Sequence, residues 1–181
     1  MKKQVIIYGI LCGLLLAFGH NAGAVSLSIG DANELGFVNF GIPSGDADRT
    51  IYVNHLINQA LGTTESADGQ TYFRSNNVFS PLDPAVWNSN GTGTSVDVGT
   101  GGFQYLFAKY DGPNYGSEVW YIGGLTGIIT IPGFGGQYGL SGWTLFTPDG
   151  ANQVPDGGST AALLGLALAG LTVVRARLQS A

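Results

Sequence analysis

Acid–base or nucleophilic catalysis would depend on very few side chains in this sequence. Of the two histidines in the 181-residue chain, only His55 follows residue 24. A serine–histidine–aspartate site would have to use it, yet the sequence has no Gly-x-Ser-x-Gly motif to present a nucleophilic serine. Because apolar residues recur around His55 at helical spacing, we expect a solvated or capped histidine on a helix instead.

Carboxylates offer a second route to catalysis, since glycoside hydrolases use two Asp or Glu side chains on either side of the scissile bond. The sequence does not single out two of its acids for that role. The candidates are Asp46, Asp48, Glu65, Asp83, Asp111 and Glu118. We therefore predict that the chain is not an enzyme and keep a glycan-active hydrolase as the second alternative.

A metal site is not indicated either. Residues 31–36 begin like a calcium-binding EF-hand loop, but Leu35 and Ile42 occupy two positions that need oxygen ligands. Zinc would need several histidine or cysteine ligands, and Cys12 is the only cysteine. We expect no metal and no cofactor.

Aromatic side chains could bind carbohydrate, because exposed rings stack on the apolar faces of sugars. Trp120 and Tyr121 are adjacent and must point to opposite faces of a strand, and Trp143 lies in a later strand candidate. Such rings are mostly buried in small β-sandwiches, and that interpretation is favoured. A sugar platform on these three residues, and with it a carbohydrate-binding module, is the alternative. Further rings in this region are Tyr105, Tyr110 and Tyr115.

The last 28 residues have three parts in strict order. A turn motif comes first, the apolar residues 161–174 follow, and Arg175 and Arg177 end the pattern. The apolar run is shorter than the ~20 residues that usually cross a bilayer, but it is apolar on all sides, unlike a helix at the surface of a globular domain. We expect a transmembrane helix with the arginines as a stop-transfer signal. The turn motif consists of Val154, Pro155, Asp156, Gly157 and Gly158.

This order of parts resembles the sorting signal of the PEP-CTERM class, in its VPDSG-CTERM form. Asp-Gly-Gly follows Pro155 here, where Glu-Pro is usual in the class. The resemblance implies an exosortase as partner, a membrane-embedded cysteine protease and transpeptidase of exopolysaccharide-producing Gram-negative bacteria. It also implies recognition at residues 154–156, transient retention in the membrane by residues 161–174, and transfer to the cell surface or matrix. Segments within residues 100–160 are similar to stretches that recur in the bodies of such proteins.

The N-terminal end predicts export. Two lysines precede the apolar residues 5–18, and Ala22 and Ala24 supply the small-x-small pattern that a signal peptidase cleaves. Cleavage after Ala24 would leave Val25 as the mature N-terminus. Positive charges flank both apolar segments on the sides away from the body, which predicts that residues 25–154 are exported.

The body between these two ends is acidic and free of cysteine. Residues 25–154 contain three basic and eleven acidic side chains, a formal net charge of −8. This charge argues against nucleic acid or an anionic membrane surface as a partner. Because no disulfide is available, the body must be stabilised by burial and hydrogen bonding.

Short apolar segments between Gly-, Pro-, Asn- and Asp-rich turns predict a mainly β body. We expect an antiparallel β-sandwich, jelly-roll-like, with one short helix that Asp48 caps and that ends before Gly62. Residues 88–102 are predicted to form a mobile loop. The expected strands are residues 25–29, 36–40, 72–79, 103–110, 117–122, 125–131 and 138–146.

The sequence therefore predicts four parts with one destination. They are a signal peptide with its signal helix (1–24), an exported β-sandwich domain (25–146), a linker (147–153) and a sorting signal with its transmembrane helix (154–181). We expect a membrane-anchored precursor that reaches the cell surface or extracellular matrix of a Gram-negative bacterium. The predicted role is structural or adhesive, in exopolysaccharide or biofilm, with exopolysaccharide as a partner.

Overall fold

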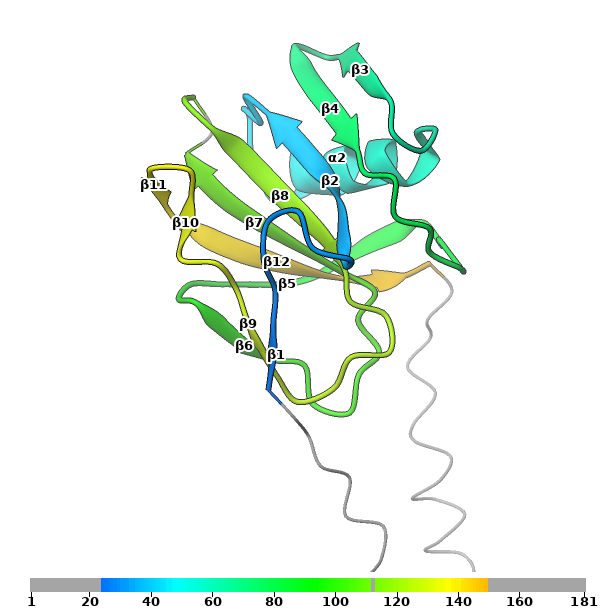
Figure 1. Ribbon diagram of the computed structural model, residues 1–181, viewed down its shortest axis with the longest axis vertical. Helices are drawn as coiled ribbons and strands as arrows, with labels where there is room; N and C mark the ends of the chain where they lie inside the picture. The colour runs from blue at the N-terminus through cyan, green and yellow to red at the C-terminus, as the bar shows by residue number, and fades with distance from the viewer. Residues whose placement is uncertain (1–23, 112, 150–181) are drawn as a thin grey trace, which may run out of the picture. The chain divides into compact units, whose positions relative to one another are not determined.

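The computed structural model describes residues 24–111 and 113–149, which are mainly β with one helix, as the sequence predicts (Figure 1). The predicted signal helix and transmembrane helix lie outside the described residues. Seven strands form the larger sheet, and every pairing between its neighbours is antiparallel. Their order is β3 (Thr64–Ala67), β4 (Gln70–Arg74), β2 (Glu34–Asn39), β8 (Gly116–Tyr121), β7 (Tyr105–Asp111), β12 (Gly142–Pro148) and β5 (Ala85–Gly91).

A smaller sheet covers part of one face of the larger sheet. Leu106, Trp120 and Leu145 of the larger sheet are buried in one cluster with Val96 and Ile129 of the smaller one. Two packed sheets of this kind are consistent with the predicted β-sandwich. The smaller sheet has the order β1 (Val25–Ser26), β9 (Ile128–Thr130) and β6 (Ser95–Asp97), with β1 parallel to β9, and a hairpin of β10 (Phe134–Gly135) and β11 (Tyr138–Gly139) follows.

Helix α2 (Asp46–Asn58) covers the opposite face of the larger sheet (Figure 1). Its buried side chains Tyr52, Val53 and Leu56 share a second cluster with apolar residues of β2, β7 and β12. Both faces of the central strands are therefore buried. This explains why β7 is apolar without alternation, since a strand covered on both faces needs apolar residues on each.

The helix begins three residues earlier than it would with Asp48 as its N-cap. Its N-cap is Gly45, and Asp48 acts from the first turn, where its Oδ2 accepts a hydrogen bond of 2.9 Å from the Gly45 N–H. Asp48 therefore caps the helix as predicted, but from the N3 position of a capping box rather than from the N-cap position. The helix ends at Asn58, where the Gln59 N–H donates to the His55 carbonyl at 3.0 Å.

Residues 88–102 do not form a loop throughout, so this prediction is wrong in part. The second half of β5 pairs with β12, with Asn90 opposite Thr144, and β6 pairs with β9. The polar composition of these segments does not predict strands, and both strands form because β12 and β9 pair with them. The predicted strand 72–79 ends at Arg74, and β12 extends to Pro148, two residues into the predicted linker.

Candidate functional site

The three rings of the alternative sugar platform do not share a surface. Trp120 is fully buried and its Nε1–H donates to the Ser28 carbonyl at 3.1 Å, so for this ring the favoured interpretation as a core residue is confirmed and the alternative of a sugar platform is wrong. Tyr121 is half-buried on the opposite, helix-covered face of the sheet. Trp143 is half-buried against the cluster that contains Trp120. With a layer on each face, the sheet buries both members of the Trp120–Tyr121 pair at least in part.

A different set of rings is accessible, and we call Phe73, Phe37, Tyr115 and Tyr138 the aromatic row. Ring centroids are 5.8 Å apart between Phe73 and Phe37, 5.1 Å between Phe37 and Tyr115, and 6.3 Å between Tyr115 and Tyr138. The Phe73 side chain is 39% exposed and the other three are half-buried. The row crosses β4, β2, the turn before β8, and β11.

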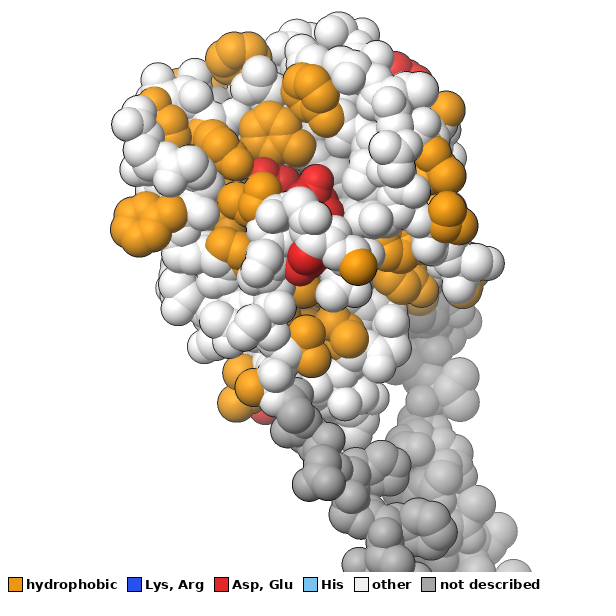
Figure 2. All heavy atoms as spheres, viewed as in Figure 1, with side chains coloured by type: hydrophobic (Ala, Val, Ile, Leu, Met, Phe, Trp, Pro, Cys, Tyr) orange, Lys and Arg blue, Asp and Glu red, His pale blue; other side chains and the backbone are white. Residues whose placement is uncertain are grey.

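Strand register brings these rings together. Phe37 lies directly opposite Phe73 on one side and Glu118 on the other, so all three side chains stand on the same face of the sheet. Figure 2 shows this face, with hydrophobic side chains gathered around a small group of acidic ones where β2, β4 and β8 lie. The row therefore has carboxyl groups beside it.

Two glycines permit the close packing around the row. A Cβ on Gly36 would lie 2.4 Å from the Phe73 carbonyl oxygen, so only glycine lets β2 approach β4 this closely. A Cβ on Gly135 would lie 2.5 Å from Cε1 of Tyr115 and 2.7 Å from Cγ of Tyr110. The β10–β11 hairpin can thus lie against these tyrosines.

Glu118 is the buried acid beside the row. Its side chain is 2% exposed, and the Tyr115 hydroxyl donates to its Oε1 at 2.9 Å. Its Oε2 is also buried and has no hydrogen-bond partner among residues 24–111 and 113–149. Burial raises the pKa of the Glu118 carboxyl to about 8, with a further rise from the charge of Glu34, while the Tyr115 hydrogen bond lowers it. At neutral pH Glu118 is therefore mostly protonated.

The Tyr115 hydroxyl remains a donor under the same conditions. Burial raises its pKa, and the nearby charges of Glu118 and Glu34 and the hydrogen bond to Glu118 act in the same direction. The Tyr115 side chain is thus fixed at its hydroxyl end by Glu118 and at its ring by Phe37. This arrangement holds the centre of the aromatic row in place.

The acids of residues 31–34 bind the backbone of their own turn. Asp31 accepts hydrogen bonds from the N–H groups of Ser28 and Asn33 at 2.7 and 2.8 Å, and the Glu34 carboxylate accepts one from the Gly30 N–H. These contacts account for the partial EF-hand pattern. Within the described ranges, no group of three or more His, Cys, Asp or Glu side chains is placed to hold a metal ion.

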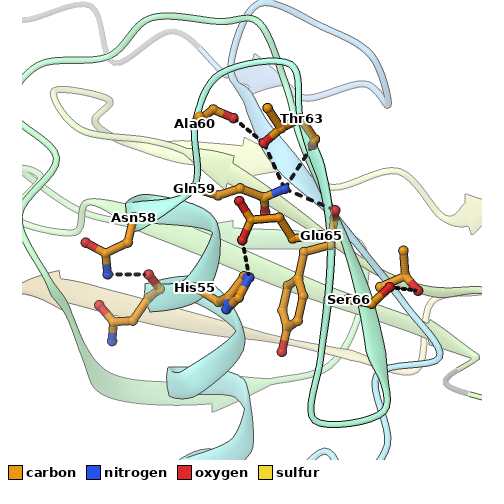
Figure 3. A network of polar contacts seen from close by, with 10 residues as sticks. His55, Asn58, Gln59, Ala60, Thr63, Glu65 and Ser66 are labelled. Carbon is orange, nitrogen blue, oxygen red and sulfur yellow. Dashed lines mark hydrogen bonds and ion pairs between the residues drawn. The ribbon is translucent and has the colours of Figure 1, made fainter.

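His55 links helix α2 to the β3–β4 hairpin rather than facing solvent (Figure 3). Its Nε2 lies 3.3 Å from Oε2 of Glu65, and its ring stacks on Tyr72 at 3.9 Å between centroids. The neighbouring Gln59 Nε2 donates to the carbonyl oxygens of Thr63 and Tyr72 at 2.9 and 3.2 Å. These contacts attach the hairpin to the helix, and they indicate a structural role for His55.

Sequence reasoning named Glu118 and Tyr115 among wider sets and missed the other members of this site. Phe37 and Phe73 both lie in predicted strands, but only the register shows that they face each other. The alternation of Gly36, Phe37 and Val38 was the available signal, since it places Phe37 away from the buried Val38.

The remaining predicted site residues lie outside the described ranges. These are Ala22, the motif residues 154–158 and the stop-transfer arginines 175 and 177. Ala24, the other predicted cleavage residue, is the first residue that the structure describes, and it is exposed. In the part of the chain that the structure describes, no helix is both long and apolar enough to span a membrane.

Comparison with known proteins finds a match in the C-terminal tail, residues 153–178. A family model described as the VPDSG-CTERM motif matches residues 153–178, which contain the turn motif, the apolar run and both arginines. No curated protein and no solved structure matches the chain. The predicted resemblance is confirmed over these residues, and the chain is one that carries a VPDSG-CTERM sorting motif of the PEP-CTERM type.

Proposed function

We propose that this chain is an exported structural or adhesive protein of the cell surface or extracellular matrix, delivered there by an exosortase-type system. The VPDSG-CTERM match at residues 153–178 is the observation that carries the proposal. A motif of this type implies an exported, membrane-anchored precursor and an exosortase-type membrane partner. The host is a Gram-negative bacterium, and exopolysaccharide or biofilm is the setting in which the body acts.

The proposed route has three steps. Signal peptidase cleaves after Ala24, residues 161–174 hold the exported precursor in the membrane, and the exosortase reads residues 154–156 at the bilayer edge. Pro155 fixes its own φ and favours an extended Val154, which suits the cleft of a protease, and the following glycines leave that cleft uncrowded. Arg175 and Arg177 keep the end of the chain on the cytoplasmic side.

A non-enzymatic body is supported by the contacts of three of the candidate catalytic groups, His55, Asp46 and Asp111. His55 is paired with Glu65 and stacked on Tyr72. Asp46 accepts a hydrogen bond of 2.7 Å from Asn90, and Asp111 accepts one of 2.8 Å from Asn114. These three side chains stabilise a turn and the contacts of helix α2 with neighbouring strands. A carbohydrate-binding module is the second candidate, favoured by the aromatic row.

Expression of the chain in two strains of one host, with and without the exosortase, tests the proposal. Membrane, surface and medium fractions are separated, and the mass of the protein in each is measured. We expect the precursor to accumulate in the membrane without the exosortase and to leave it, with a mass changed by loss or exchange of the tail, when the enzyme is present. Equal distribution and equal mass in the two strains would contradict the proposal.

A further inference from the structure

Residues 25–28 dock onto the body, and we call them the N-terminal strap. The first two residues of the strap form β1, which is parallel to β9 with Val25 opposite Ile129 (Figure 1). The Leu27 N–H donates to the Thr130 carbonyl at 2.9 Å, and the Leu27 side chain is 4% exposed within the cluster between the two sheets. The strap is thus held both by backbone pairing and by burial of an apolar side chain.

The other end of the strap is fixed as well. The Ser28 carbonyl accepts a hydrogen bond of 3.1 Å from Nε1 of the fully buried Trp120, and the Ser28 N–H donates to Oδ2 of Asp31 at 2.7 Å. Undocking of the strap would therefore leave a buried indole N–H without its partner. This cost makes the undocked state rare once the body has folded.

We propose that signal peptidase cleaves after Ala24 only while the N-terminal strap is undocked, so that docking of the strap ends the period in which the signal peptide can be removed. This inference rests on the proposed function, in which cleavage after Ala24 is the first step. A protease binds the residues on both sides of the scissile bond as an extended segment whose backbone is free of other partners. Folded segments are therefore cut through locally opened states.

The predicted scissile bond has no slack on the side of the body. Ala24 is exposed, but Val25, the next residue, is already paired with β9. Because a chain reaches at most about 3.6 Å per residue, the bond between Ala24 and Val25 cannot enter a protease cleft while β1 stays paired. Docking withdraws the residues that follow the bond from the enzyme.

The order of segments along the chain provides a period in which the strap is free. Trp120 lies 92 residues after Ser28, and β9 lies further along the chain. An exported chain emerges with its N-terminal end first, so the strap crosses the membrane long before its partners do. Pairing between such distant segments is also slow, because the loop between them must close first. The cleavage site is therefore accessible during export and inaccessible in the folded body.

The C-terminal motif has the slack that the N-terminal site lacks. Strand β12 ends at Pro148, and the motif begins at Val154. The residues between these two positions reach about 20 Å when extended. An exosortase can therefore read the motif on a folded body, whereas signal peptidase has to act before the strap docks.

Cleavage of the folded, full-length precursor by purified signal peptidase tests the proposal. The precursor is expressed in cells depleted of signal peptidase, purified in detergent and checked for a cooperative unfolding transition. A spacer variant carries the insertion Val-Ser-Gly-Ser-Gly-Ser between Ala24 and Val25, which keeps valine after the scissile bond and gives this site about the slack of the C-terminal motif. The control carries the same insertion between Gly150 and Ala151. We expect the spacer variant to be cleaved after Ala24 at least about tenfold faster than wild type and the control, as followed by mass spectrometry.

Leu27→Ala loosens the strap without lengthening the chain. The substitution leaves Ala22 and Ala24 in place but removes the buried side chain that anchors the strap. Val98→Ala is its matched control, because Val98 is 2% exposed in the same cluster but is not part of the strap. We expect Leu27→Ala to speed cleavage of the folded precursor about tenfold or more, and Val98→Ala to speed it less than about threefold.

Two results would overturn the proposal. Equal cleavage rates of folded wild type and the spacer variant, whether fast or slow, would show that the strap does not limit cleavage. Equal rates of Leu27→Ala and Val98→Ala would show that local docking is not involved. Both results leave the proposed function standing if cells that contain signal peptidase yield a protein that begins at Val25. Absence of cleavage after Ala24 in those cells would contradict the proposed route itself, and this inference with it.

Discussion

Replacement of the buried acid Glu118 by glutamine should remove a pH-dependent loss of stability. The pKa of Glu118 is raised from 4.5 to about 8 in the folded protein, chiefly by burial. The unfolded chain therefore ionises at lower pH than the folded one, and unfolding releases a proton between these values. Stability that depends on protonated Glu118 is fully present below about pH 4.5 and is lost as the pH rises to about 8.

The size of the loss follows from the shift. At about 1.4 kcal/mol for each pH unit, a rise from 4.5 to about 8 corresponds to a loss on the order of 5 kcal/mol in the free energy of unfolding. Glutamine has the shape of the protonated acid and does not ionise. We expect Glu118→Gln and wild type to have similar stability near pH 4.5, and the variant to be more stable by several kcal/mol at pH ~8 and above.

Urea unfolding of the full-length chain across this range, followed by tryptophan fluorescence, measures the difference. All three tryptophans lie in the described body, so the signal reports its unfolding. Asp68→Asn is the matched control, because Asp68 is exposed in a turn at φ 51°, a conformation that asparagine also adopts. A difference between Glu118→Gln and wild type that stays constant from acidic to alkaline pH would refute the reasoning.

Two further predictions concern packing and export. A Cβ on Gly91 would lie 2.1 Å from Cζ2 of Trp143, so Gly91→Ala should lower the free energy of unfolding of the body by about 1–3 kcal/mol, measured by thermal or urea unfolding. Gly139→Ala is the control and should have a much smaller effect, because no atom lies within 4 Å of a Cβ built there. Equal effects of the two substitutions would contradict the contact between Gly91 and Trp143. N-terminal sequencing of the protein from the envelope or medium should begin at Val25, and recovery there of chains that retain the N-terminal lysines would contradict signal-peptide cleavage.

The mainly β class and the central strands could be predicted because the sheet is buried on both faces. That burial requires the dense apolar runs over residues 103–110 and 117–122, which are strong local signals. The same burial rules out the alternative of a sugar platform on Trp120. Adjacent residues do face opposite sides of β8, but the smaller sheet covers Trp120 and helix α2 covers the side of Tyr121, and this coverage is set by tertiary packing rather than by the strand pattern.

The edge strands and the assembly of the aromatic row could not be predicted, for a related reason, although the alternation around Phe37 indicated which way that ring faces. β5 and β6 contain polar residues such as Asn90 and Ser95, and they form because β12 and β9 offer backbone partners. The row exists because the register places Phe37 between Phe73 and Glu118. Register depends on pairing between distant segments, which the local sequence does not specify.

Substitution of both Pro155 and Asp156 by alanine tests the central claim, that the tail is a sorting signal, most directly. The control is Asp149→Ala with Asn152→Ala, which also changes two residues and one acid but lies outside the matched residues 153–178. We predict that the Pro155/Asp156 variant is exported and loses its signal peptide but stays in the membrane with its tail intact, while the control is processed like wild type. If mass spectrometry finds the Pro155/Asp156 variant at the surface or in the medium with the mass and yield of wild type, the tail is not read as a sorting signal.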